Sequence, residues 1–194
     1  MSQKNKVDHY IQDQKFDGSS GNPSINRGDY ENCLFRNCNF ANIDLSGFNF
    51  TECEFEGCDL STAVLRNTGF KQVQFRNCKM IGLAFDSCSD FLLAFDFIDC
   101  ILNFSSFYRL KIPNSSFINC RILESDFTNA DLKGSTFEGS DLAAAIFHET
   151  GLEKCDFTGA LNYSIDPEIN RITKAKFSLP EVVGLLDKYK IVIE

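Results

Sequence analysis

A large apolar residue occupies every fifth position over most of this chain. The period runs from Tyr30 to Phe85, resumes at Leu92 after two extra residues, and continues to Phe157. Neither the 3.6-residue period of an amphipathic helix nor the two-residue period of a strand produces this spacing. The pattern therefore predicts a stack of five-residue units rather than a helical domain or an ordinary β-sandwich.

A second position in each unit is mostly small. It lies two residues before the large one and holds Cys, Ser, Thr or Ala in most units. All nine cysteines fall there, if Cys88 is counted in the register that precedes the two extra residues. Their odd number and the lack of any C-x₂-C pair favour buried, reduced thiols over disulfides or a zinc site. Because one large and one small side chain cannot form a core alone, the units must stack.

The repeat resembles a known family. The stretches FRNCNFANIDLSGFNF, FTNADLKGSTFEGSDL and CDFTGA resemble the A-[DN]-L-x-x pattern of pentapeptide-repeat proteins, over roughly residues 28–160. The resemblance implies an all-β fold, a right-handed quadrilateral β-helix in which four five-residue sides make one turn. Residues twenty positions apart should then stack. One predicted column, here named the Phe side, collects Phe35, Phe55, Phe75, Phe97, Phe117, Phe137 and Phe157.

Three segments are expected. Residues 1–27 form an N-terminal cap or loop, with Val7, Tyr10, Ile11 and Phe16 in a partial turn. Residues 28–160 form the β-helix, about six and a half turns or ~30 Å long, with a bulge near 86–91 that holds the two extra residues. Residues 161–194 form a capping and dimerisation segment with a short α-helix at about 179–188. Ser178 and Glu181 match a capping box, and Pro180 suits the first helical turn.

The tail sharpens the resemblance. The order CDFTGALNYSIDPEINRI followed by FSLPEVVGLLDKYKIVIE resembles the topoisomerase-protecting subgroup, which includes quinolone-resistance, microcin B17 immunity and albicidin-resistance proteins. That resemblance implies a homodimer joined through its C-terminal helices, which binds DNA gyrase or a related type II topoisomerase as a DNA mimic. Some quinolone-resistance members carry long projecting loops, whereas this chain has only the short irregularity FDSCSDFL. The expected dimer interface comprises Leu179, Val182, Val183, Leu186, Tyr189, Ile191 and Ile193.

The charge of the chain lies on the repeat. The net charge is −8, and residues 28–160 hold nineteen acidic and ten basic residues. This balance argues against direct DNA binding, which requires cations that neutralise phosphates. We expect the partner to contact the acidic residues on the Phe side, where only Arg36 and Arg76 oppose them. An alternative is that the acids merely solvate a scaffold for some other protein. The expected contact residues are Glu54, Glu56, Asp96, Asp99, Glu138 and Asp156.

Signals for other functions are missing. The only histidines are His9 and His148, and no Ser-His-Asp set or metal-spaced cluster occurs. We therefore expect no catalytic site, no metal and no cofactor. No apolar stretch is long enough to cross a membrane, and the N-terminus lacks the apolar core of a secretory signal. These features predict a cytoplasmic protein that does not contact membranes.

Overall fold

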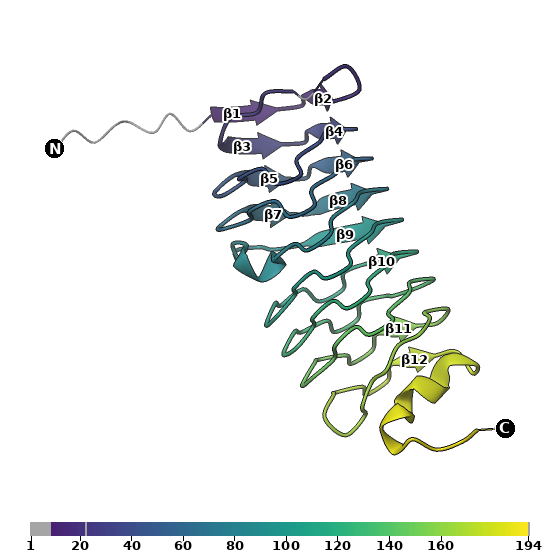
Figure 1. Ribbon diagram of the computed structural model, residues 1–194. Helices are drawn as coiled ribbons and strands as arrows, with labels where there is room; N and C mark the ends of the chain where they lie inside the picture. The colour runs from purple at the N-terminus through teal and green to yellow at the C-terminus, as the bar shows by residue number, and fades with distance from the viewer. Residues whose placement is uncertain (1–8, 22, 194) are drawn as a thin grey trace.

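The computed structural model describes residues 9–21 and 23–193 of the chain. It shows an all-β, right-handed solenoid of about eight turns, a rod with β1 at one end and the C-terminal segment at the other (Figure 1). The β-helix predicted from the five-residue repeat is confirmed. Val7, which was placed in a partial first turn, lies outside the described residues.

Two stacks of parallel strands run along the rod. The first contains β1 (His9–Gln12), β3 (Gly28–Glu31), β5 (Asn49–Thr51) and β7 (Gly69–Lys71). The second contains β2 (Lys15–Asp17), β4 (Leu34–Arg36), β6 (Glu54–Glu56), β8 (Val73–Arg76), β9 (Phe95–Ile98) and β10 (Phe117–Ile118). Near the C-terminal end, β11 (Asp156–Phe157) pairs with β12 (Lys176–Phe177), and elsewhere single parallel bridges join the turns.

Each turn has four sides, numbered here in chain order by the column of large residues that point inward. Side 1 follows the β1–β7 stack and contains Tyr30 and Ile112. Side 2 is the predicted Phe side and contains β4, β6 and β8. Side 3 has Phe40 and Ile122 inside, and side 4 has Leu45 and Phe127 inside. All six of these named inward residues are buried.

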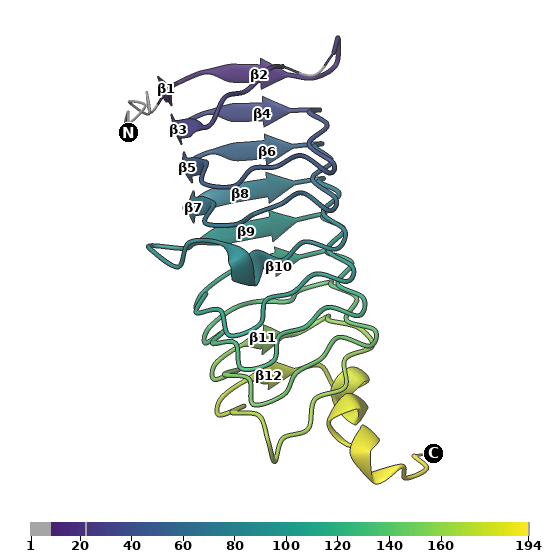
Figure 2. The same ribbon diagram turned by 60° about the vertical axis from the view of Figure 1, so that its left-hand side comes forward.

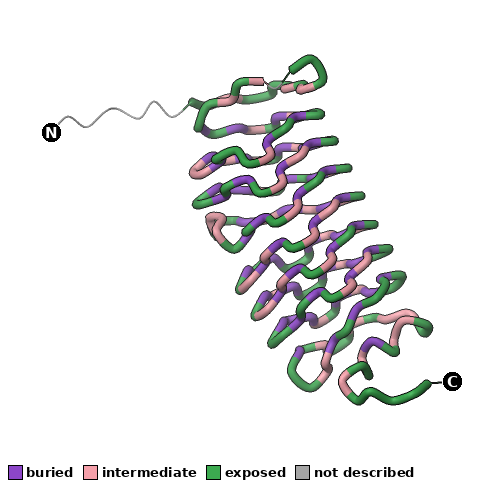
Figure 3. The backbone as a smooth tube through the Cα atoms, viewed as in Figure 1, coloured by how far each residue is buried: buried purple, intermediate pink, exposed green. Residues whose placement is uncertain are grey.

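The inward rings of side 2 form one continuous stack. From Phe16 to Phe177, successive ring centroids lie 4.7–5.3 Å apart, with interplanar angles of 24° or less. This separation matches the distance between neighbouring strands, about 4.8 Å, so each ring rests on the ring of the preceding turn. Figure 3 shows the resulting alternation of buried and exposed residues along each turn. The Phe column predicted from residue spacing is therefore confirmed, and it extends one turn further at each end.

The small inward residue of each unit both fits the limited space and forms a hydrogen bond when it carries a thiol or a hydroxyl. Its thiol or hydroxyl donates a hydrogen bond to the carbonyl of the large residue in the preceding turn. Cys58 donates to Phe35 O at 3.3 Å, and Ser140 donates to Phe117 O at 2.8 Å. All nine cysteines are free, and all except the partly buried Cys88 are buried. Desolvation raises the pKa of the Cys53 thiol to about 12, so that thiol stays protonated at neutral pH.

The corners of the rod require left-handed backbone. After side 2 the corner residues include Asn37, Gly57, Asn77 and Asn119, with φ between 52° and 63°. Asn and Gly adopt this conformation at low cost, which explains their frequency in the repeat. At Gly57 a Cβ would also lie 2.7 Å from Asn37 Oδ1, so a larger residue would displace the neighbouring corner.

The two extra residues form a loop rather than a simple bulge. Pairing partners are twenty residues apart at Phe55 and Phe75, but 22 apart at Phe75 and Phe97. The chain makes a short 3₁₀ helix, η1 (Phe85–Ser87), and then projects on the β1–β7 side of the rod (Figure 2). Leu92, predicted to lie inside, is 66% exposed, and Leu93 is buried instead. The prediction for Leu92 is wrong because the loop turns its backbone out before the register resumes.

The rod is longer than the repeat indicated. At the N-terminal end β1 and β2 pair with β3 and β4 at a spacing of 19 residues, which adds a turn. At the C-terminal end parallel bridges continue beyond Ala160, joining Asp141 to Leu161 and Gly151 to Arg171. About eight turns at ~4.8 Å give a rod ~40 Å long, rather than ~30 Å.

The predicted α-helix at 179–188 is not present. Two 3₁₀ helices occur instead, η2 (Glu181–Leu185) and η3 (Asp187–Tyr189). Gly184 is buried against Tyr163, and its carbonyl accepts the Ile165 N–H at 3.0 Å. That carbonyl therefore bonds to the rod rather than to the next turn of a helix. The predicted capping box is also wrong, because the Ser178 hydroxyl accepts the Gly159 N–H at 2.8 Å and makes no cap bond to η2.

Candidate protein-interaction surfaces

The six acidic residues expected to contact a partner all lie on side 2. Glu54 and Glu56 belong to β6, Asp96 to β9 and Asp156 to β11. The ladder of pairings aligns them along the rod, through Glu54 with Gln74 and Gln74 with Asp96. Asp99 occupies a left-handed corner and is exposed, as is Glu138.

Three of these six carboxylates have a cation beside them. Glu56 pairs with Arg36 at 2.8 Å and Glu54 with Arg76 at 3.0 Å. Asp156 pairs with Lys176 at 3.0 Å. Such exposed pairs contribute little stability, but each one cancels a charge that a DNA-binding cleft could otherwise attract. Side 2 is therefore less acidic than its sequence indicates, and the uncompensated charge is that of Asp96, Asp99 and Glu138.

Some of the repeat's aspartates have a local structural role. Asp156 Oδ1 accepts the Thr158 N–H at 2.9 Å, and hydrogen bonding with the Thr158 side chain, together with this backbone bond, lowers the pKa of Asp156. Asp44 accepts the Ser46 N–H, and hydrogen bonding with the Ser46 side chain, together with that backbone bond, lowers the pKa of Asp44. Asp96 bonds across turns instead, accepting the Ser116 N–H at 2.8 Å. These carboxylates hold the turn together, so their abundance alone does not indicate a binding surface.

Side 1 has an uneven distribution of charge along the rod, which was not predicted from the sequence. The first three turns of this side carry four acids, and its last four turns carry mostly cations. A sum over the whole side comes close to zero and hides the separation. Summing the outward residues turn by turn would have found it. The acids are Asp13, Asp29, Glu31 and Glu52.

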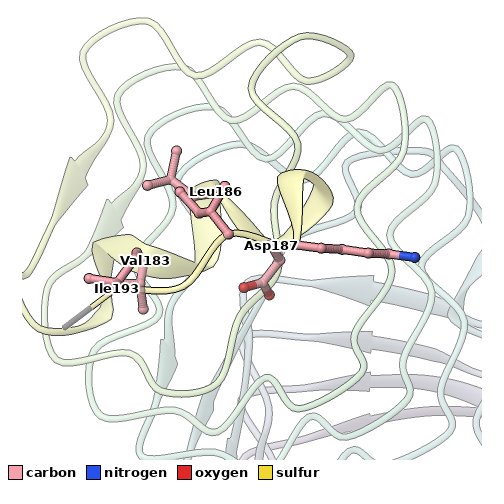
Figure 4. Close-up of a pocket in the computed structure, with 6 residues that line it drawn as sticks. Val183, Leu186, Asp187 and Ile193 are labelled. Atoms are coloured by element: carbon pink, nitrogen blue, oxygen red, sulfur yellow. The ribbon is translucent and has the colours of Figure 1, made fainter.

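The C-terminal segment exposes most of the apolar residues expected at a dimer interface. Six of the seven are exposed, and Val182 is half-buried. Leu179 is 88% exposed, and Val192, which was not among the expected residues, is 86% exposed. A hollow of about 360 Å³ lies between η2 and the end of the chain, and Figure 4 shows the residues that line it. It is lined by Val183, Leu186, Asp187, Lys190, Ile191 and Ile193.

Polar contacts attach this segment to the last turn of the rod. Lys188 Nζ lies 2.7 Å from Asp166 Oδ1 and 2.6 Å from Glu168 Oε2. Desolvation opposes the charge of Lys188, but its bonds to the two carboxylates outweigh that effect and raise its pKa. The same hydrogen bonds lower the pKa of Asp166 and of Glu168. Tyr189 adds a hydrogen bond from its hydroxyl to Glu168 Oε1 at 3.0 Å.

Tyr163 lies between the segment and the rod. Its ring packs on Phe157 and Phe177, and desolvation raises the pKa of Tyr163 to about 12. Its hydroxyl is buried without a hydrogen-bond partner among the described residues. A buried, unpaired hydroxyl costs free energy, so this contact is less well matched than the interior of the rod.

Two other kinds of site do not occur in the described part of the chain. No group of three or more His, Cys, Asp or Glu side chains there is arranged to hold a metal ion. Within residues 9–21 and 23–193, no helix has the length and apolar character needed to cross a membrane.

Known structures share this fold. Full-length QnrB1, described as a plasmid-mediated fluoroquinolone resistance protein, matches with a TM-score of 0.63 and 20% identity, covering 94% of this chain and 97% of that one. A trypsin-treated QnrB1 variant matches with a TM-score of 0.64 and 20% identity, covering 96% of this chain and 98% of that one. HetL, from the cyanobacterium Nostoc sp. strain PCC 7120, is a pentapeptide repeat protein involved in heterocyst differentiation regulation. It matches with a TM-score of 0.45 and 13% identity, covering 88% of this chain and 84% of that one. At this identity the likeness to QnrB1 establishes the fold.

Sequence comparisons identify the family. No curated protein sequence matches the chain. The profile described as a pentapeptide repeat region matches residues 29–89, and the profile of pentapeptide repeats in eight copies matches residues 125–161. Together the two matched segments make up about half of the chain, and both lie within the four-sided rod. The chain therefore belongs to the pentapeptide-repeat family.

Proposed function

We propose that this protein is a non-catalytic, DNA-mimicking rod that binds DNA gyrase or a related type II topoisomerase and protects it from a poison. Its role would be antibiotic resistance or immunity, in the cytoplasm where its partner acts. The observation that carries the proposal is the exposed apolar segment at one end of an acidic rod. The sequence of that segment resembles the topoisomerase-protecting subgroup.

The proposal includes a homodimer. Leu186, Ile191 and Ile193 border the hollow at the C-terminal end, and their exposure has no use in a monomer. A tail-to-tail contact would bury them and join two rods into one of ~80 Å. The fold shared with QnrB1 supports the protective role rather than the dimer, since QnrB1 is described as a fluoroquinolone resistance protein.

The partner's basic cleft would contact side 2 through its uncompensated acids. Asp96 and Asp99 lie on the turn that contains β9, and Glu138 lies two turns further along that side. Their attraction to a DNA-binding cleft is a summed field effect, and it weakens as salt screens it. Glu54, Glu56 and Asp156 contribute less because each has a cation beside it.

A supercoiling assay with purified gyrase tests the proposal. The protein should either inhibit supercoiling at high concentration or restore it in the presence of a quinolone or albicidin. Asp99→Lys/Glu138→Lys should lose most of the effect, whereas the control Glu124→Lys/Glu149→Lys, with the same change in net charge on other sides, should keep it. No effect of the wild-type protein in any arm would refute the proposed function.

A second candidate is a structural scaffold that binds some other protein. The internal ion pairs of side 2 favour it, because they reduce the resemblance to a uniformly charged duplex. A stable dimer without any effect on supercoiling or on poison sensitivity would support the scaffold.

A further inference from the structure

Side 1 carries opposite charges in its two halves. Near the N-terminal end its outward residues include Asp13, Asp29, Glu31 and Glu52. Near the C-terminal end Asp131 and Glu153 are outnumbered by five cations, one of which, Arg171, pairs with Glu153 at 3.1 Å. The five cations are Lys111, Lys133, Lys154, Arg171 and Lys174.

Apart from the Arg171–Glu153 pair, these charges form no ion pairs among the described residues of their own half. Asp13 and Asp29 accept hydrogen bonds from Asn side chains, at 2.6 and 2.7 Å, and Glu31 accepts one from the Tyr10 hydroxyl at 2.7 Å. Neither the four acids nor the four lysines form an ion pair within the described ranges. Side 2 alternates its charges and pairs them, whereas side 1 separates them along the rod.

An apolar tip lies between the two halves. The loop after η1 is attached to side 1 by the Ala94 N–H, which donates to Phe70 O at 3.0 Å. At its tip Phe91 is 64% exposed and Leu92 is 66% exposed. The Lys71 ammonium lies 5.0 Å from the centre of the Phe91 ring. Figure 2 shows this loop projecting beside β7, near the middle of the rod.

We propose that side 1 is a self-complementary surface that binds side 1 of a second copy of this chain, with the two rods antiparallel. The two-fold axis would pass through the turn that carries Phe91 and Leu92. A two-fold interface requires complementary groups at equal distances on either side of its axis.

The order of residues along side 1 meets that requirement. Glu52 and Lys133 each lie about two turns from the loop, on opposite sides of it, and Asp29 and Lys154 each lie about three turns away. Asp13 and Lys174, both in left-handed corners, each lie about four turns away. Each of these three acids therefore lies at the height of a lysine of the other rod, and the two apolar tips meet at the axis. Asp131 and Glu153 share the turns of Lys133 and Lys154, so they would also approach Glu52 and Asp29 of the other rod.

Next to the axis, cations oppose cations. Lys71 and Lys111 each lie one turn from the loop, so the ammonium of one copy would approach that of the other. The Lys71 ammonium is drawn toward the Phe91 ring, which reduces this repulsion. The antiparallel pairing is thus favoured by the net charges of the two halves, four acids in one and an excess of three cations in the other. It is opposed by Lys71 and Lys111 next to the axis and by Asp131 and Glu153 two and three turns away.

The size of the surface sets its strength. A side ~10 Å wide and ~40 Å long would bury roughly 800 Å² in total over both copies, below the ~1,200 Å² of a stable specific interface. The association is therefore weak and depends on charge. It goes beyond the proposed function, which uses side 2 and the C-terminal segment.

Charge swapping tests the pairing. We would measure self-association by sedimentation velocity on the full chain carrying Leu186→Arg, so that C-terminal contacts do not contribute. In this background Asp29→Lys/Glu52→Lys and Lys133→Glu/Lys154→Glu should each weaken association at least about tenfold, because two of the three opposed pairs become repulsive. An equimolar mixture of the two should associate about as well as the parent, since each lysine then meets a glutamate or aspartate.

Two controls complete the design. Glu124→Lys/Glu149→Lys changes the net charge as much as the first variant, on sides 3 and 4, and should leave association unchanged. Raising the salt from 0.1 to 1 M, which shortens the Debye length from about 10 to about 3 Å, should weaken association of the parent. A parent that is monomeric at 0.1 M salt, or a mixture no better than its components, would overturn the proposal. Binding of a DNA duplex to the lysine half that outcompetes self-association would also overturn it.

Discussion

The rod and its C-terminal segment treat apolar side chains in opposite ways. Inside the rod, Phe117 is fully buried between Phe97 and Phe137, with ring centroids 5.2 and 4.9 Å away. In the segment, Leu179 and Val192 are almost fully exposed. The difference follows from the repeat, because stacking works only where each turn presents the same shape to the next. Where the repeat ends, apolar residues remain without a turn to pack on.

The largest expected difference between the two regions is in the free energy of unfolding, when one apolar side chain in each is truncated to Ala. Phe117→Ala should lower the free energy of unfolding by about 3–5 kcal/mol, since a fully buried ring is lost and its cavity remains. Leu179→Ala should change it by less than about 0.5 kcal/mol. Urea denaturation followed by circular dichroism measures both. Equal effects would mean that the segment is packed as tightly as the rod.

A smaller effect is expected on assembly. Leu186→Arg should weaken the proposed C-terminal dimer at least about thirtyfold, because it places a charge in the apolar hollow. The melting temperature of the monomer should not change. Ile146→Arg, at a position 51% exposed on side 4, controls for the loss of an exposed apolar residue and should leave the dimer intact. Light scattering reports the mass, and a monomeric wild-type protein would refute the interface.

The smallest effect concerns the attachment of the segment to the rod. Asp166 and Glu168 have pKa values below their ordinary values of 3.8 and 4.5. Their bonds to Lys188 therefore stabilise the attachment fully when the pH is above those ordinary values. The stabilisation is lost as the pH falls through the lowered pKa values. The raised pKa of Lys188 keeps its charge throughout this range. Hydrogen exchange in residues 181–190, corrected for its intrinsic pH dependence, should therefore rise a few-fold in acid.

A matched variant isolates this ion cluster. Lys188→Met should show the faster exchange at pH 7 already, with little further change in acid, while amides of the rod stay protected in both proteins. If corrected hydrogen exchange in the wild-type segment were independent of pH, the ion pairs of Lys188 with Asp166 and Glu168 would not attach the segment to the rod.

Much of the rod could be predicted from spacing alone. The five-residue period placed Phe35 and Phe137 in one column, and it also showed that two residues were inserted before Phe97. Such inferences succeed because an inward side chain has one environment, repeated at each turn. The same reasoning failed at Leu92, where the loop leaves the rod and the period no longer determines which residue points inward.

The ends and the surfaces were harder to predict. The turn containing β1 and β2 is 19 residues long and has no visible repeat, so only its parallel pairing shows that it belongs to the rod. The α-helix expected after Ser178 had ordinary helix signals. It is replaced by 3₁₀ turns because Gly184 packs on Tyr163, a contact between residues 21 positions apart that local patterns do not encode.

The sequence by itself determined the family, the four-sided rod and the residues that fill it, because each five-residue unit buries one large and one small side chain at the same two positions. Only the tertiary structure decided which charges remain available outside. It joined Glu54 to Arg76 and Glu56 to Arg36 across neighbouring turns, and it separated the acids and lysines of side 1 into opposite halves. The physical reason is that the charge a surface presents depends on distances between turns, which a count of residues per side does not contain.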